Sequence, residues 1–109
     1  MAKTLPHAAV PPEVLRVSDL IVAQACPKRV YLYNQRVSIG GVTYAFKLCV
    51  VLETPDKHAA ETALYMQIDC EVPFDLLLYT PEEWETLLAQ PGSFAGRIQK
   101  TGVLLYDTP

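Results

Sequence analysis

The sequence predicts one α/β (α+β) domain, built on a mixed β-sheet of about four strands with flanking helices. Its 109 residues, half of them hydrophobic and 19% charged, suit a single domain with a modest core. Segments with helical spacing of apolar residues alternate with short runs of β-branched and aromatic residues. Their order is helix, strand, strand, helix, strand, helix, helix, strand, which favours a mixed sheet with helices on one or both faces.

The beginning of the chain divides at its third proline. Residues 1–12 hold three prolines and no apolar periodicity, so they are predicted to form a flexible N-terminal arm ahead of a single domain over residues 13–109. In PPEVLRVSDLIVAQAC the apolar residues recur near helical intervals. Proline at the start of this helix does no harm, because the first N–H groups of a helix have no intrahelical partner.

Two strands are predicted next, in RVYLYN (29–34) and in AFKLCVVLE (45–53). The second contains an apolar run typical of a strand that is covered on both faces. Gly40 and Gly41 favour a turn within the linker QRVSIGGVTY. The linker fits a hairpin loop or one short helix plus a loop, and periodicity does not separate the two.

The second half of the chain carries clear boundary signals. TPDKHAAETALYMQID (54–69) is predicted to be a helix that joins two strands, and EVPFDLLLYT supplies the later strand. Thr80, Pro81 and Glu83 then form the pattern of a capping box at a helix start. SFAGRIQKTG is predicted to be a short helix that Gly102 terminates, and VLLY closes the chain as the last strand.

The composition excludes several classes of function. A formal charge of -3 without any basic cluster argues against a nucleic-acid partner. No apolar run reaches 18 residues and the N-terminus lacks a secretion pattern, so no membrane partner and a cytoplasmic location are expected. The three cysteines are widely spaced, which predicts reduced, buried thiols and neither a disulfide framework nor a zinc site.

Asp75 stands out because it lies in an apolar run, where a carboxylate needs a partner. Its surroundings, FDLLLYTPEEWETLLAQPGSFAGRIQKTGVLLYD, resemble the end of minimal nucleotidyltransferase domains of the DNA polymerase beta superfamily. RVYLYNQRVSIGGVTYAFKLCVVLE resembles the core of the same domains. The resemblance covers about Val14 to Asp107.

The resemblance implies a site built from a GSxAxG segment, a DxD pair and a third aspartate, which together hold magnesium ions and a nucleoside triphosphate. Placed on this chain without gaps, the glycine and serine become Asn34 and Gln35, and the aspartate pair becomes Phe46 and Leu48. Only the third aspartate remains, as Asp75. One carboxylate in place of three predicts a degenerate domain with no metal and no cofactor, because hard cations need several oxygen ligands.

Three functions are compatible with the resemblance. The first is a non-catalytic interaction or regulatory protein, which acts on a protein partner or as a homodimer. A small helical protein in a toxin–antitoxin pair is one such partner. The alternative is an active or weakly active nucleotidyltransferase that uses ATP and magnesium, with Asp75 and a partner completing the site. The third function is sensing of a nucleotide without turnover.

Two features of the expected cleft are relevant to these candidate functions. Asn34, Gln35 and Arg36 have donors for a nucleotide phosphate, although they also fit a plain polar loop. Tyr44 and Phe46 are expected where the family's cleft opens, and there they would form an apolar patch.

Overall fold

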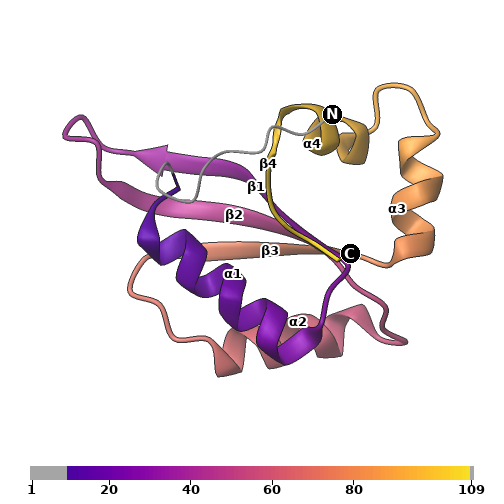
Figure 1. Cartoon of the computed structure of the whole chain (residues 1–109), viewed down its shortest axis with the longest axis horizontal. Coiled ribbons are helices and arrows are strands. Elements are labelled where there is room, and N and C mark those ends of the chain that lie inside the picture. The colour runs from indigo at the N-terminus through magenta and orange to yellow at the C-terminus, as the bar shows by residue number, and fades with distance from the viewer. Residues whose placement is uncertain (1–9, 109) are drawn as a thin grey trace.

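The computed structural model describes residues 10–108 (Figure 1). Four helices and four strands alternate in the predicted order. The helices are α1 (Pro12–Ala25), α2 (Lys57–Gln67), α3 (Pro81–Leu88) and α4 (Phe94–Thr101). The strands are β1 (Arg29–Val37), β2 (Thr43–Val51), β3 (Phe74–Tyr79) and β4 (Val103–Asp107).

The four strands form one mixed sheet in the order β3-β2-β1-β4. β1 is antiparallel to both β2 and β4, whereas β2 and β3 are parallel. The parallel pair requires a crossover, which α2 provides, because parallel strands cannot be joined by a tight turn. This mixed α+β architecture confirms the predicted fold class.

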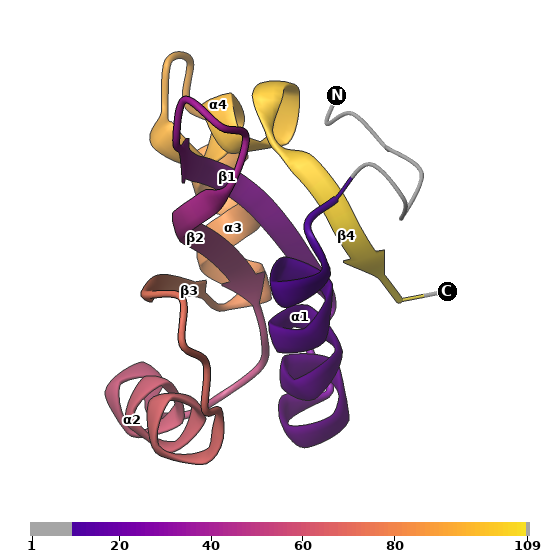
Figure 2. The same ribbon diagram turned by 90° about the vertical axis from the view of Figure 1, so that its left-hand side faces the viewer.

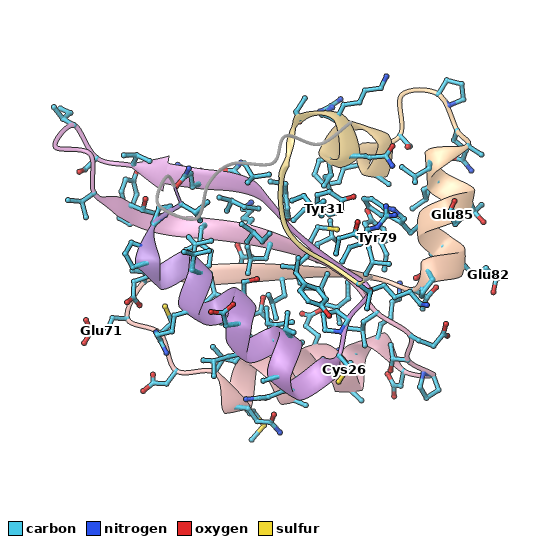
Figure 3. All side chains as sticks on the ribbon, in the orientation of Figure 1. Cys26, Tyr31, Glu71, Tyr79, Glu82 and Glu85 are labelled. Atoms are coloured by element: carbon cyan, nitrogen blue, oxygen red, sulfur yellow. The ribbon has the colours of Figure 1, made fainter. Side chains whose placement is uncertain are left out.

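Helices cover the sheet on both faces (Figure 2). α1 and α2 pack on one face, where the alternate strand residues that include Leu32, Leu48 and Leu76 join the larger core. α3 and α4 pack on the other face, where Trp84 lies against Tyr31 and Tyr79 with ring centroids 5.4 and 5.7 Å apart. Figure 3 shows the two tyrosines on the side of the sheet that α3 and α4 occupy. The two faces therefore have separate apolar cores.

Local signals in the sequence account for the helix boundaries. The side chain of Thr80 accepts a hydrogen bond from the N–H of Glu83, and the Glu83 carboxylate accepts one from the N–H of Thr80. This is the predicted capping box. Ser93 caps α4 in a similar way, and Gly102 follows its end as predicted.

The linker whose structure the sequence left open is the turn of a β-hairpin. The N–H of Gly41 donates to the carbonyl of Ser38 at 2.9 Å, and the N–H of Ser38 donates to the carbonyl of Val42 at 2.8 Å. Gly41 has a φ of 86°, which a residue with a Cβ adopts at a cost. The short-helix alternative is therefore wrong.

Three smaller expectations need correction. Residues 1–9 of the predicted arm lie outside the described residues, but Val10 is only 4% exposed in the core and Pro12 already begins α1. α2 begins at Lys57, after the cap Asp56, and not at Thr54. Cys26 is exposed, because it follows the end of α1 in a left-handed conformation, outside the apolar stripe of that helix.

The helical layers cover only part of the β1–β2 hairpin. β4 pairs with residues 29–32 of β1, and β3 pairs with β2 from Phe46 onward, so residues 33–45 project beyond both neighbours. We call residues 33–45 the bare hairpin. Residues 34–42 are all exposed, whereas every residue from Leu48 to Leu52 is buried.

Over residues 10–108, none of the helices has the length and apolar character needed to cross a membrane.

Candidate functional site

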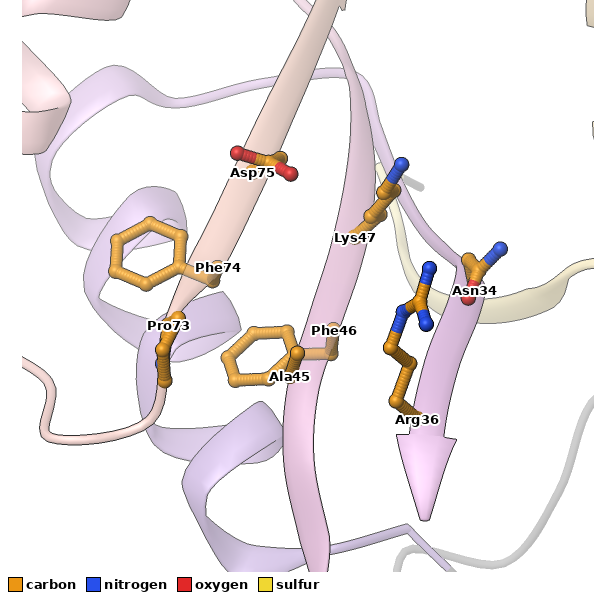
Figure 4. A pocket seen from close by; sticks show the side chains of 8 residues that line it. All are labelled: Asn34, Arg36, Ala45, Phe46, Lys47, Pro73, Phe74 and Asp75. Carbon is orange, nitrogen blue, oxygen red and sulfur yellow. The ribbon is translucent and has the colours of Figure 1, made fainter.

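A small cavity of about 250 Å³ lies at the base of the bare hairpin, where β1, β2 and β3 are adjacent (Figure 4). It mixes charged, amide and apolar side chains from three adjacent strands. Its lining residues are Asn34, Arg36, Ala45, Phe46, Lys47, Pro73, Phe74 and Asp75. The sheet thus brings one of its few exposed carboxylates together with two cations.

Strand register decides which side chains surround Asp75. In the parallel β2–β3 pair, Asp75 lies opposite Lys47. Since alternate residues of a strand point to opposite faces, the residues on either side of Lys47 face away from Asp75. The side chain beside the carboxylate is therefore a cation and not a second carboxylate.

The side chains of Phe46 and Leu48 do not share the sheet face of Asp75, although Phe46 borders the cavity. Both are buried in the core under α1 and α2, on the opposite face of the sheet. There Phe46 stacks on Phe74, with ring centroids 5.7 Å apart. The expectation that Phe46 and Leu48 share a face with Asp75 is therefore wrong, because counting along the chain does not determine which residues of two strands share a face. Lys47 holds the position beside Asp75, and Cys49 follows it on the same face.

The three predicted phosphate-binding residues also do not all lie at the cavity. Asn34 and Arg36 line the cavity, and Asn34 is paired with Lys47 across the β1–β2 ladder. Gln35 does not line it, and its side chain lies 3.2 Å from the hydroxyl of Thr43, which donates a hydrogen bond to it. Two of the three residues therefore reach the site.

The charges of the cavity are only loosely matched. Arg36 and Lys47 carry two positive charges against the one negative charge of Asp75. The ion pairs within 4.0 Å among residues 10–108 involve none of these three side chains. Burial raises the pKa of the neighbouring Tyr33 phenol, with smaller contributions from Cys49 and Asp75, so this phenol stays protonated at neutral pH. The site has donors in excess of acceptors.

This donor set does not fit the magnesium site that the resemblance implies. Magnesium prefers several oxygen ligands, whereas here a single carboxylate faces an ammonium group. Across the described part of the chain, no three His, Cys, Asp or Glu side chains are grouped closely enough to hold a metal ion.

Sequence reasoning left one feature of this region open and missed another. The place of Lys47 beside Asp75 depends on strand register, which the sequence does not determine and the structure shows. The missed feature is the apolar surface of the bare hairpin, where Tyr44 is 52% and Val42 is 66% exposed. Tyr44 is thus exposed as expected, but Phe46 is 2% exposed and adds nothing to a surface patch. The uncharged run VSIGGV was the available signal, because such a run seldom surrounds an exposed glycine turn without a reason.

Searches with this chain find no matching family model, no matching curated protein and no matching solved structure.

Proposed function

We propose that this chain is a nucleotidyltransferase-like domain that has lost catalysis and acts by binding another protein. The observation that carries the proposal is the pairing of Asp75 with Lys47 on adjacent strands. A cation at that position repels the metal ions that nucleotidyl transfer uses, because both charges are positive and close together. A binding role remains for a chain whose site lacks the ligands for such chemistry.

The surface of the chain supports the binding role. Four of its exposed large apolar side chains gather on one projecting hairpin, whereas soluble proteins usually scatter them singly. These residues are Val37, Ile39, Val42 and Tyr44. A protein partner would remove this surface from water and gain hydrophobic stabilisation.

Calorimetric titration with ATP and magnesium, together with an assay for labelled nucleotide transfer, tests the proposal. We expect no magnesium-dependent heat and no transfer to protein or small-molecule acceptors. Asp75→Asn should leave both results unchanged. Asp69→Asn serves as the matched control, since Asp69 is exposed and lies outside the cavity.

Magnesium-dependent ATP binding that Asp75→Asn abolishes and Asp69→Asn spares would overturn the proposal in favour of an active enzyme. ATP binding that persists with a chelator and is lost in Lys47→Ala would replace it with nucleotide sensing, since Lys47 and Arg36 are the phosphate donors at hand.

A further inference from the structure

We infer that residues 33–37 of β1 form a docking edge, where an extended acidic segment of a partner protein adds as a β-strand. This inference rests on the proposed protein-binding function and names the kind of partner. We call residues 33–37 the open edge. The inference depends on three properties of this edge: its unpaired backbone, its apolar neighbours and its charge.

The backbone of the open edge has no strand beside it on one side. Within residues 10–108, β1 is paired with β2 along most of its length, but β4 reaches only as far as Leu32. Residues 33–37 therefore have no strand on that side. Tyr33 packs against Phe94 of α4, with ring centroids 5.6 Å apart, so the fully exposed part is residues 34–37, about 14 Å of strand. Unpaired strand edges bind extended peptides by continuing the sheet, and main-chain hydrogen bonds provide the affinity.

The other two sheet edges are less suited to such a ligand. On β3, the N–H of Leu76 donates to the Tyr65 hydroxyl at 2.6 Å, so a side chain from α2 already satisfies part of that edge. The five residues of β4 include no lysine or arginine, and the carboxylate of Asp107 is already paired with Arg29 at 3.3 Å. An acidic segment is therefore directed to β1.

Apolar side chains lie at the end of the open edge and beyond it, toward the tip of the hairpin. Val37 is 48% exposed at its end, and Ile39 is fully exposed in the turn that follows. A segment that pairs with residues 33–37 passes next to both. Specificity in strand addition comes from such side-chain contacts, because the backbone bonds are alike for every sequence.

Charge decides between a foreign segment and a second copy of this chain. Residues 33–47 contain Arg36 and Lys47 but no aspartate or glutamate. A second copy that paired through the same edge would bring another arginine to the contact and no acid. A partner strand with a glutamate opposite Arg36 gains a cross-strand ion pair, which is favourable where like charges are not.

The test uses synthetic peptides as probes. An eight-residue fluorescent peptide that alternates valine with threonine and glutamate is titrated against the full chain at low salt, and anisotropy is followed. One control peptide carries lysine in place of glutamate, and a second carries N-methyl groups on alternate amides. We expect the acidic peptide to bind about tenfold tighter than the lysine peptide, and the N-methylated peptide not to bind.

Charge reversal gives the sharper result. Arg36→Glu should make the lysine peptide the tighter ligand, while Arg97→Glu, on the exposed surface of α4, should keep the wild-type preference. Both residues are exposed, and circular dichroism checks that each variant folds. Amide NMR shifts on binding should be largest over residues 33–37 and small over residues 29–32, which β4 already pairs.

Equal binding of the acidic and lysine peptides, no binding, or shifts centred on β3 or β4 would overturn the inference. So would a dimer in sedimentation experiments whose interface maps to residues 33–37, because a second copy would then occupy the edge. Failure of the proposed function is a separate result: it would appear as ATP binding or nucleotide transfer, neither of which the peptide experiment measures.

Discussion

The two halves of the β1–β2 hairpin belong to the same strands but have opposite environments. Near its base, Leu32 and Leu48 are paired across the ladder and buried, between α1 and α2 on one face and α3 and α4 on the other. Toward its tip, Val37 and Val42 are exposed although they are just as apolar. The covered half stabilises the fold, and the bare half is available for contacts.

This difference shows that apolar residues of the same strand can have different roles, depending on whether they are buried or exposed. Each buried aliphatic side chain contributes about 1.5–3 kcal/mol to folding, whereas an exposed one contributes little. The apolar character of the tip therefore has no folding advantage that would account for it. The proposed protein-binding role gives it a reason.

The largest expected effect is a loss of stability when an apolar side chain is shortened to alanine. Its size depends on which half of the hairpin contains that side chain. Leu48→Ala should lower the free energy of unfolding by about 2–5 kcal/mol, because Leu48 is fully buried and leaves a cavity. Val42→Ala, on the bare hairpin, should change it by less than about 0.5 kcal/mol. Urea unfolding followed by circular dichroism measures both. Equal losses would mean that the tip is part of the cooperative core, against the proposed division.

The covered half also contains a buried thiol, so the free energy of unfolding should depend on pH. Burial raises the pKa of the Cys49 thiol from 9.0 to about 12. Unfolding therefore releases a proton between these pH values, and the free energy of unfolding should fall by about 1 kcal/mol for each pH unit above 9.

Urea unfolding of the wild type and of Cys49→Ala from about pH 8 to about pH 10 isolates this contribution. The variant is less stable at every pH, but its stability should decline less steeply. The raised pKa of Tyr65 does not involve Cys49, so this residue contributes equally to both proteins. Cys49 adds to the raised pKa values of Tyr31 and Tyr79, so the difference between the two slopes reports the thiol together with its effect on these phenols. Parallel declines would show that Cys49 is not shielded from water.

The smallest effect concerns the turn of the bare hairpin. Gly41→Ala places a Cβ at a φ of 86°, which costs about 1–2 kcal/mol locally. Gly40→Ala is the matched control, because Gly40 has no positive φ and its added Cβ would lie 3.9 Å from Ser38. Hydrogen exchange should quicken over residues 37–43 in Gly41→Ala alone, while amides from Leu48 to Leu52 stay protected. Faster exchange in both regions would contradict the independence of the two halves.

Much of the fold was predictable from the sequence because local signals determine it. The capping box of Thr80 and Glu83 involves residues three apart, and such patterns need no knowledge of tertiary structure. The face of Lys47 was not predictable, since it depends on the register between β2 and β3, which are separated by α2. Exposure of the hairpin depends on where β4 ends, and it was missed for the same reason.

The residues around the cavity also differ in whether the sequence was enough to place them. Asp75 was identified from its apolar setting. Asn34 and Arg36 were identified because the resemblance places a phosphate-binding segment there and both side chains have donors. Phe46 and Leu48 were misplaced because a shift of one residue turns a strand side chain to the opposite face.

A titration with manganese, read by NMR line broadening, tests most directly the claim that this sheet face holds no metal centre. A positive control carries Ala45→Asp and Lys47→Asp, which place two carboxylates on the face of Asp75. We predict no selective broadening of the Asp75 and Lys47 amides in the wild type, and broadening at these positions in the control, with manganese bound at least about tenfold tighter. Selective broadening at Asp75 in the wild type, lost in Asp75→Asn, would contradict the account.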